Sequence, residues 1–186
     1  MARRRFNADD IIAYWFKELK PEDWFSGSAK LDEAIKARFL PVCLEVLAGN
    51  PDDHIDSPRS ALAAILVLDQ FTRNVYRGTA EAFSGDQSAI AICHIALERR
   101  YDEQLTPDER QFLYMPLQHS EILADQELSV KKYSDLGGEE AIRYAVEHRD
   151  IIARFGRFPH RNRALGRTST PEELEFLEDH DGFGQK

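Results

Sequence analysis

Apolar residues recur every three or four positions along most of the chain, which is the spacing of one face of an α-helix. The pattern predicts helices over residues 7–19, 28–47, 86–100 and 139–155, and the first three begin at an Asn, Ser or Asp that can cap a helix. No segment alternates with the period of two that is typical of a strand. The predicted fold class is therefore all-α.

Three further helices are predicted to begin at prolines that follow a serine or threonine cap, namely Pro58, Pro107 and Pro171. Pro41 and Pro116 lie instead within helical patterns, where we expect a kink or a break. Short loops join the helices in succession, which favours antiparallel hairpins stacked side by side. We expect a single domain over residues 1–186.

The helix that begins at Pro58 contains an apolar run of eight residues, Ala61–Leu68. A helix that is apolar on all sides is typically buried, and this run is far too short to cross a membrane. Cys43 and Cys93 lie in similar apolar stretches, so we expect both to be reduced core residues of a cytoplasmic protein. The composition, 42% hydrophobic and 31% charged, is ordinary for a globular protein.

Charge is distributed unevenly along the sequence. The formal net charge of −9 argues against a nucleic-acid partner. Residues 149–167 nevertheless hold six arginines against one aspartate, a local charge of +5 that leaves −14 for the rest of the chain. Gly156, Pro159 and Gly166 predict that much of this segment is a loop, called the basic loop below. Guanidinium groups favour two-point binding of carboxylate or phosphate, so the arginines either bind an external anion or pair with the chain's own acids.

A polar segment, DQFTRNVYR, begins at Asp69 directly after the apolar run. Helical spacing places Asp69 and Arg73 on one face. It places three other polar side chains on a second face: Gln70, Asn74 and Arg77. Because buried polar groups need partners, the segment is either an internal Asp69–Arg73 ion pair at a polar helix end or one wall of a binding site.

Three histidines are candidate acid–base groups, namely His119, His148 and His160. Glu121 follows His119 closely and could orient it in a hydrolase-like role. The favoured alternative is that Ser120 caps the next helix and Glu121 faces the helix dipole. His148 lies on the apolar stripe of its helix, where a histidine is more often a packed core residue.

Common catalytic and cofactor motifs are absent from the sequence, which contains no P-loop, GxSxG, HExxH, CxxC or GxGxxG. The two cysteines are 50 positions apart and no two histidines are four apart, so a zinc site is disfavoured. We expect no metal and no cofactor.

Four segments in this order, DQFTRNVYR, YMPLQHSE, HRDIIARFGRFPHRN and STPEELEFL, resemble the bacterial domain-of-unknown-function family 924. Phe83 fits the same pattern, whereas Thr72 stands where the pattern leads us to expect proline. The resemblance covers nearly the whole chain. It implies an all-α fold of tetratricopeptide-like helical hairpins, which we expect to form a right-handed superhelix, and it implies no known activity.

We expect the polar segments to converge on one concave face that binds a small anionic ligand. The residues expected to bind it are Gln70, Arg73, Asn74, Arg77, Arg154, Arg157, Arg161 and Asn162. The catalytic candidates, if chemistry follows binding, are His119, Glu121, His148 and His160. Two alternatives stay open: a helical-repeat scaffold that binds an acidic peptide of a partner protein, and a purely structural polar network. We expect no membrane partner, and the sequence predicts no oligomeric state.

Overall fold

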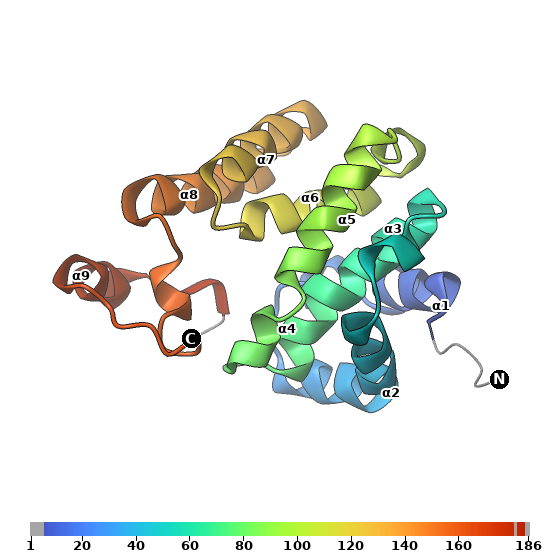
Figure 1. Cartoon of the computed structure of the whole chain (residues 1–186), viewed down its shortest axis with the longest axis horizontal. Coiled ribbons are helices and arrows are strands. Elements are labelled where there is room, and N and C mark those ends of the chain that lie inside the picture. Colours follow the sequence, from blue (N-terminus) through green and yellow to red (C-terminus); the bar gives the residue numbers. More distant parts are fainter. Residues whose placement is uncertain (1–5, 181, 185–186) are drawn as a thin grey trace. The chain divides into compact units, whose positions relative to one another are not determined.

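The computed structural model describes residues 6–180 and 182–184, and every regular element within these ranges is helical. The predicted all-α class is confirmed (Figure 1). The chain divides into two compact units, which are described separately here. The first comprises Met1–Arg77 and Glu81–Pro116, and the second comprises Gly78–Ala80 and Leu117–Lys186.

The first unit is organised around α3 (Pro58–Ile65), which packs against two other helices. All eight residues of the apolar run Ala61–Leu68 are at most 1% exposed, so the predicted burial of this helix is confirmed. The remaining α-helices of this unit are α1 (Ala8–Ala13), α2 (Ala29–Ala48), α4 (Thr72–Val75), α5 (Asp86–Glu98) and most of α6 (Pro107–His119). α1 and α5 contact α3, and α2 contacts α4.

A π-helical segment, Leu66–Phe71, links α3 directly to α4. A π-helix fits an additional residue into the turn, which rotates the residues that follow it relative to an α-helix. Every residue of this segment is buried, including Asp69 and Gln70. The hydroxyl of Thr72 donates to the carbonyl oxygen of Leu68 at 2.7 Å, so this threonine also hydrogen-bonds within the helix.

Two prolines lie within helices without interrupting them. α2 runs on through Pro41 and α6 runs on through Pro116, so neither proline breaks its helix. Asp86 was a predicted cap but is the first residue of α5, and Gly85 is the N-cap. A Cβ atom at Gly85 would collide with the carbonyl oxygen of Leu68, which explains why the chain carries glycine there.

The second unit contains α7 (Leu123–Leu136), α8 (Glu139–Phe155) and α9 (Pro171–Asp179). α7 and α8 lie side by side as a hairpin (Figure 1). Gly137 and Gly138 join them with φ values of 87° and 96°, which favour glycine. Ile151 and Ile152 of α8 form a core cluster with Phe158. The stacking of hairpins into a tetratricopeptide-like superhelix stays a prediction.

The predicted capping box at the start of α9 is confirmed. Glu173 N–H donates to the hydroxyl of Thr170, and Thr170 N–H donates to the carboxylate of Glu173 at 2.8 Å. None of the helices within the described residues is long and apolar enough to cross a membrane.

Candidate functional site

The DQFTRNVYR segment of the first unit is tied together by a buried guanidinium group. Nη1 of Arg73 lies 3.2 Å from Oδ1 of Asp69 and 2.9 Å from Oδ1 of Asp86, and Nη2 donates to Oδ2 of Asp86 at 3.1 Å. The side chains of Arg73 and Asp69 are 8% and 1% exposed. The internal Asp69–Arg73 ion pair that the helical spacing predicted is therefore confirmed, and Asp86 is an additional partner.

The other polar side chains of this segment also bond within the first unit. Gln70 donates to Oδ2 of Asp69 at 2.6 Å. Asn74 donates to Oδ1 of Asp32 at 2.8 Å, and Arg77 donates to both oxygens of Asp32 at 2.6 and 2.9 Å. Burial raises the pKa of Asp32, but the hydrogen bonds from Arg77 and Asn74 outweigh this effect and hold the pKa below its usual value. The side chains are thus fixed to the chain's own carboxylates.

The basic loop of the second unit contains a similar arrangement around Glu173. Arg157 binds both oxygens of Glu173 at 2.6 and 2.8 Å and donates to the carbonyl oxygen of Thr168 at 2.9 Å. Asn162 donates to the same carboxylate at 3.2 Å. The hydrogen bonds from Arg157 are the largest cause that lowers the pKa of Glu173 to about 2. Arg157 and Asn162, both predicted ligand groups, therefore bind an acid of α9.

Glu121 is the second carboxylate that accepts hydrogen bonds from the basic loop. Arg167 binds its two oxygens at 2.8 and 3.0 Å, and the backbone N–H of Phe158 donates to it at 2.8 Å. Burial raises the pKa of Glu121, but these hydrogen bonds outweigh it and hold the pKa below its usual value. The favoured prediction for this region was wrong, because α7 begins at Leu123 behind Ile122 and Ser120 is not its cap.

Arg161 is buried at 6% exposure and reaches the end of α6. Its Nη2 donates to the carbonyl oxygen of His119 at 2.9 Å, and its guanidinium carbon lies 4.5 Å from the centre of the Phe158 ring. A cation at the C-terminus of a helix is favoured by the helix dipole. This contact gives Arg161 a local role in the packing of the second unit.

The histidine candidates of the second unit are largely buried. His148 and His160 are 4% and 8% exposed, and Nδ1 of His148 lies 2.8 Å from the carbonyl oxygen of Tyr144. Burial is the largest cause that lowers the pKa of His148 to about 3 and that of His160 to about 2. General acid–base catalysis works best with a pKa near the working pH, so both rings are poorly suited to it at neutral pH. The ring of His119 lies 6.0 Å from that of His148.

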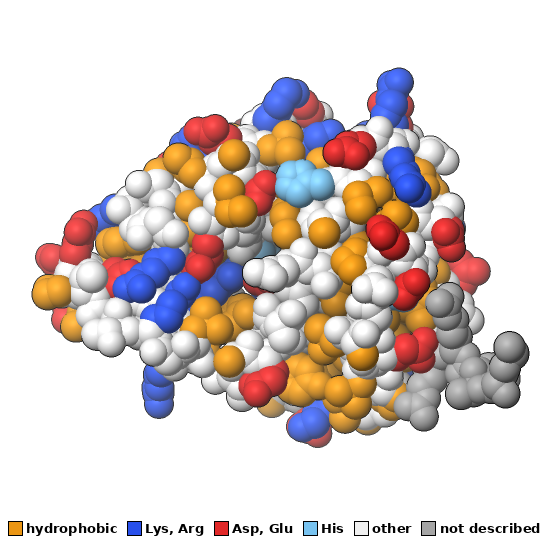
Figure 2. Space-filling view, viewed as in Figure 1, with side chains coloured by type: hydrophobic (Ala, Val, Ile, Leu, Met, Phe, Trp, Pro, Cys, Tyr) orange, Lys and Arg blue, Asp and Glu red, His pale blue; other side chains and the backbone are white. Residues whose placement is uncertain are grey.

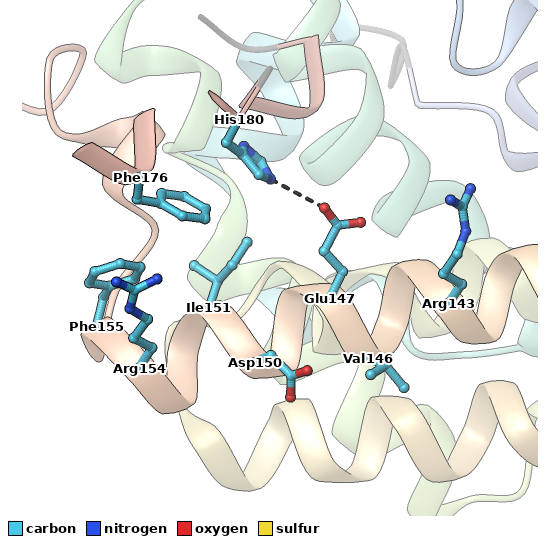
Figure 3. A pocket seen from close by; sticks show the side chains of 9 residues that line it. All are labelled: Arg143, Val146, Glu147, Asp150, Ile151, Arg154, Phe155, Phe176 and His180. Carbon is cyan, nitrogen blue, oxygen red and sulfur yellow. Dashed lines mark ion pairs between the residues drawn. The ribbon is translucent and has the colours of Figure 1, made fainter. Parts of the chain in front are cut away.

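An open hollow of about 520 Å³ lies along α8 within the second unit. Figure 3 shows Arg154 at one end, Arg143 at the other, and the ring of Phe176 from α9 between α8 and His180. The side chains of Arg154 and Arg143 are 52% and 69% exposed. Arg154 lies over the ring of Phe155 at 4.6 Å and contacts Oε1 of Glu172 at 2.8 Å.

The hollow contains residues that sequence reasoning missed. Phe176 lies in the STPEELEFL segment, where it is an apolar residue of the short final helix, and His180 follows that helix; neither was among the candidate site residues. Nε2 of His180 lies 3.4 Å from Oε1 of Glu147 (Figure 3). Arg154 is the one predicted ligand residue among those that line the hollow.

The structure assembles the predicted residues in two groups, one in each unit. The first group surrounds Asp69 and Asp32, and the second surrounds Glu121 and Glu173. Figure 2 shows basic and acidic side chains beside one another over the region that α9 and the basic loop occupy in Figure 1. The described residues contain no group of three or more His, Cys, Asp or Glu that could hold a metal ion. Convergence of all three segments on one face stays a prediction.

Comparison with known proteins agrees with the resemblance seen in the motifs. A solved structure of a protein of unknown function from Agrobacterium tumefaciens is 39% identical and superposes with a TM-score of 0.87, covering 93% of this chain and 97% of the other. A comparison with curated proteins finds no match. The model of the family described as "bacterial protein of unknown function (DUF924)" matches residues 11–181. The chain therefore belongs to this bacterial family, DUF924.

Proposed function

We propose that the second unit binds a small anionic ligand, a carboxylate or a phosphate, in the hollow along α8. The observation that carries this proposal is the exposure of Arg154 and of the carboxylate it contacts. Arg154 is half exposed at the hollow, and the carboxylate that it contacts, Glu172, has a side chain that is itself 61% exposed. An incoming anion can therefore replace Glu172 without leaving a buried charge unpaired.

The free energy needed to break its ion pair distinguishes Arg154 from Arg157 and Arg167. Exposed ion pairs typically contribute about 0–1 kcal/mol, whereas removing one partner from a buried pair costs about 3–5 kcal/mol. Arg157 is held by a glutamate whose side chain is 3% exposed. Arg167 is held at both oxygens of Glu121, whose side chain is 29% exposed, about half the exposure of Glu172. The proposed ligand set is thus narrower than the one predicted from the sequence.

The walls of the hollow indicate what else the ligand carries. The rings of Phe155 and Phe176 have centres 5.1 Å apart, and Ile151 adds a further apolar side chain. The volume of about 520 Å³ lies within the range of about 300–1,000 Å³ that is usual for small-molecule sites. A ligand with one anionic group and a small apolar body fits this combination. Benzoate and inorganic phosphate are suitable probes for the two anion types.

Titration calorimetry at low salt tests the proposal with a matched pair of variants. Arg154→Ala removes the cation at the hollow, and Arg163→Ala removes the same charge from an exposed position of the basic loop that does not line it. We expect the wild type and Arg163→Ala to bind benzoate or phosphate alike. We expect Arg154→Ala to bind at least about tenfold more weakly, because hydrogen bonds to charged groups contribute about 1.5–3 kcal/mol.

Two results would contradict the proposal: no binding by the wild type at millimolar probe concentrations, or equal weakening in both variants. Equal weakening would show that the anion responds to the charge of the loop as a whole. A cytoplasmic location is part of the proposal, because Cys43 and Cys93 are free thiols and the reducing cytosol keeps thiols in this form.

A second candidate, a scaffold for an acidic peptide, is favoured by the open form of the hollow. An extended chain can lie along α8 and place a carboxylate on Arg154, whereas an enclosed cavity would admit only a small molecule. Fluorescence anisotropy with a labelled acidic peptide distinguishes the two. Tight binding of the peptide, together with no binding of benzoate or phosphate, would favour the scaffold.

A further inference from the structure

The C-terminal residues that the structure describes, His180 and Gly182–Gly184, lie against the histidines of the second unit and are called the strap here. The ring of Phe183 stacks on the imidazole of His148, with centres 3.9 Å apart and an interplanar angle of 19°. It also lies 5.5 Å from the ring of His160 and 4.6 Å from that of His180. Three imidazoles therefore contact one phenyl ring.

A hydrogen bond within the strap joins Gly182 to the ring of His180. The backbone N–H of Gly182 donates to Nδ1 of His180 at 2.9 Å, so this nitrogen carries no proton while the bond exists. Nε2 of the same ring faces Oε1 of Glu147 on α8 at 3.4 Å (Figure 3). The bond from Gly182 places the proton of the neutral ring on Nε2, the nitrogen that faces Glu147.

We propose that the strap is a pH-sensitive latch, closed over α8 while the imidazoles of His148 and His160 are neutral and released when they take up protons. A charged ring at His148 or His160 needs hydration, which the packed Phe183 ring prevents. Release of the strap lets water reach these rings.

The surroundings of His148 and His160 oppose protonation in the closed state. Among the described residues, Nδ1 of His160 is buried without a hydrogen-bond partner. Three groups that are positive or can become so act on both rings: His119, Arg161 and His180. Burial comes first and these charges add to it, so the pKa of His148 falls to about 3 and that of His160 to about 2. The carbonyl of Tyr144 acts in the opposite direction on His148 and raises its pKa.

The sign and size of the pH effect follow from these values. A histidine that is exposed by opening titrates near its usual pKa of about 6.5. Above that pH both states hold neutral rings, and pH has no effect on the latch. Below it, each ring favours the open strap by about tenfold per pH unit, and His148 and His160 together by about 100-fold. The window runs from about pH 6.5 down to the closed-state pKa of about 3.

The backbone conformation of the strap also favours the open state. Phe183 has φ 53° and ψ 36°, a left-handed conformation that residues other than glycine adopt at a cost. The contacts of its ring therefore hold the backbone in this conformation. When protonation weakens those contacts, release of the strap also lets the backbone of Phe183 leave this costly conformation.

Amide hydrogen exchange at Gly182 and Phe183, corrected for the intrinsic effect of pH, measures opening of the strap. In the wild type we expect constant protection above about pH 7 and a loss of at least about tenfold per pH unit below about pH 6.5. In the double variant His148→Gln/His160→Gln this steep loss should be largely absent. The matched control is His94→Gln in α5 of the first unit, which should behave as the wild type.

Protection that does not change with pH in the wild type, or that falls equally in the double variant, would overturn the latch. If the double variant does not fold, NMR titration of the wild-type imidazoles decides the question. Rings of His148 and His160 that titrate near pH 6.5 while the strap stays protected would overturn it, and rings that stay neutral until the strap opens would support it. No ligand is added, so the outcome does not depend on the proposed anion binding.

Discussion

Replacing Arg73 by methionine removes the guanidinium that holds Asp69 and Asp86 together while keeping most of the length of the side chain. Asp69 is then a carboxylate with a side chain only 1% exposed, and its closest cation is gone. Asp86 is less affected, because its side chain is 21% exposed and water can reach it. The destabilisation should therefore come mainly from Asp69.

The expected magnitude is that of breaking a buried ion pair, about 3–5 kcal/mol in the free energy of unfolding. With a urea slope of about 1–3 kcal/mol per molar, this is a fall in midpoint of at least about 1 M. Tryptophan fluorescence is the appropriate measurement, because Trp15 and Trp24, the two tryptophans of the chain, both lie in the first unit with Arg73. The fluorescence change therefore reports unfolding of the first unit and not of the second.

The matched control is Arg38→Met, which breaks an ion pair with Glu18 in the same unit. The side chains of that pair are 44% and 49% exposed, so we expect a loss of about 0–1 kcal/mol. Equal losses in the two variants, at unchanged slope, would show that Arg73 and Asp69 are hydrated and would refute the buried ion pair.

Three further predictions follow from single contacts. Gly85→Ala should lower the urea midpoint of the first unit by the equivalent of about 1–3 kcal/mol, because the new Cβ meets the carbonyl of Leu68; a midpoint equal to wild type would contradict the close approach. Glu173 has a pKa lowered to about 2, so its stabilising effect is present above about pH 4.5 and is lost as pH falls toward 2; Glu173→Gln should flatten the dependence of thermal midpoint on pH in that window. Burial raises the pKa of the Cys43 thiol to about 12, so it should react with a disulfide reagent at pH 8 only after urea unfolding.

Local features of the sequence were sufficient to predict the helices. The apolar spacing, the capping box at Thr170 and the continuous apolar run Ala61–Leu68 each involve residues within a few turns of one another. Interactions at this range are set by backbone geometry, which the sequence reports directly. The Asp69–Arg73 ion pair was predictable for the same reason, since its residues are one helical turn apart.

The tertiary structure alone decided which acids Arg73, Arg77 and Arg167 contact over long distances in the sequence. Arg73 reaches Asp86 across 13 positions, Arg77 reaches Asp32 across 45, and Arg167 reaches Glu121 across 46. The chain offers 33 acidic residues, and any of them satisfies a guanidinium group equally well in the sequence. Folding selects among them by how deeply each carboxylate is buried and how closely the chain brings it to a guanidinium group. The same packing pairs Arg157 with a buried glutamate and leaves Arg154 exposed. The sequence thus determined that the arginines gather in one segment, whereas the packing of α7, α8 and α9 decided which of them stay exposed.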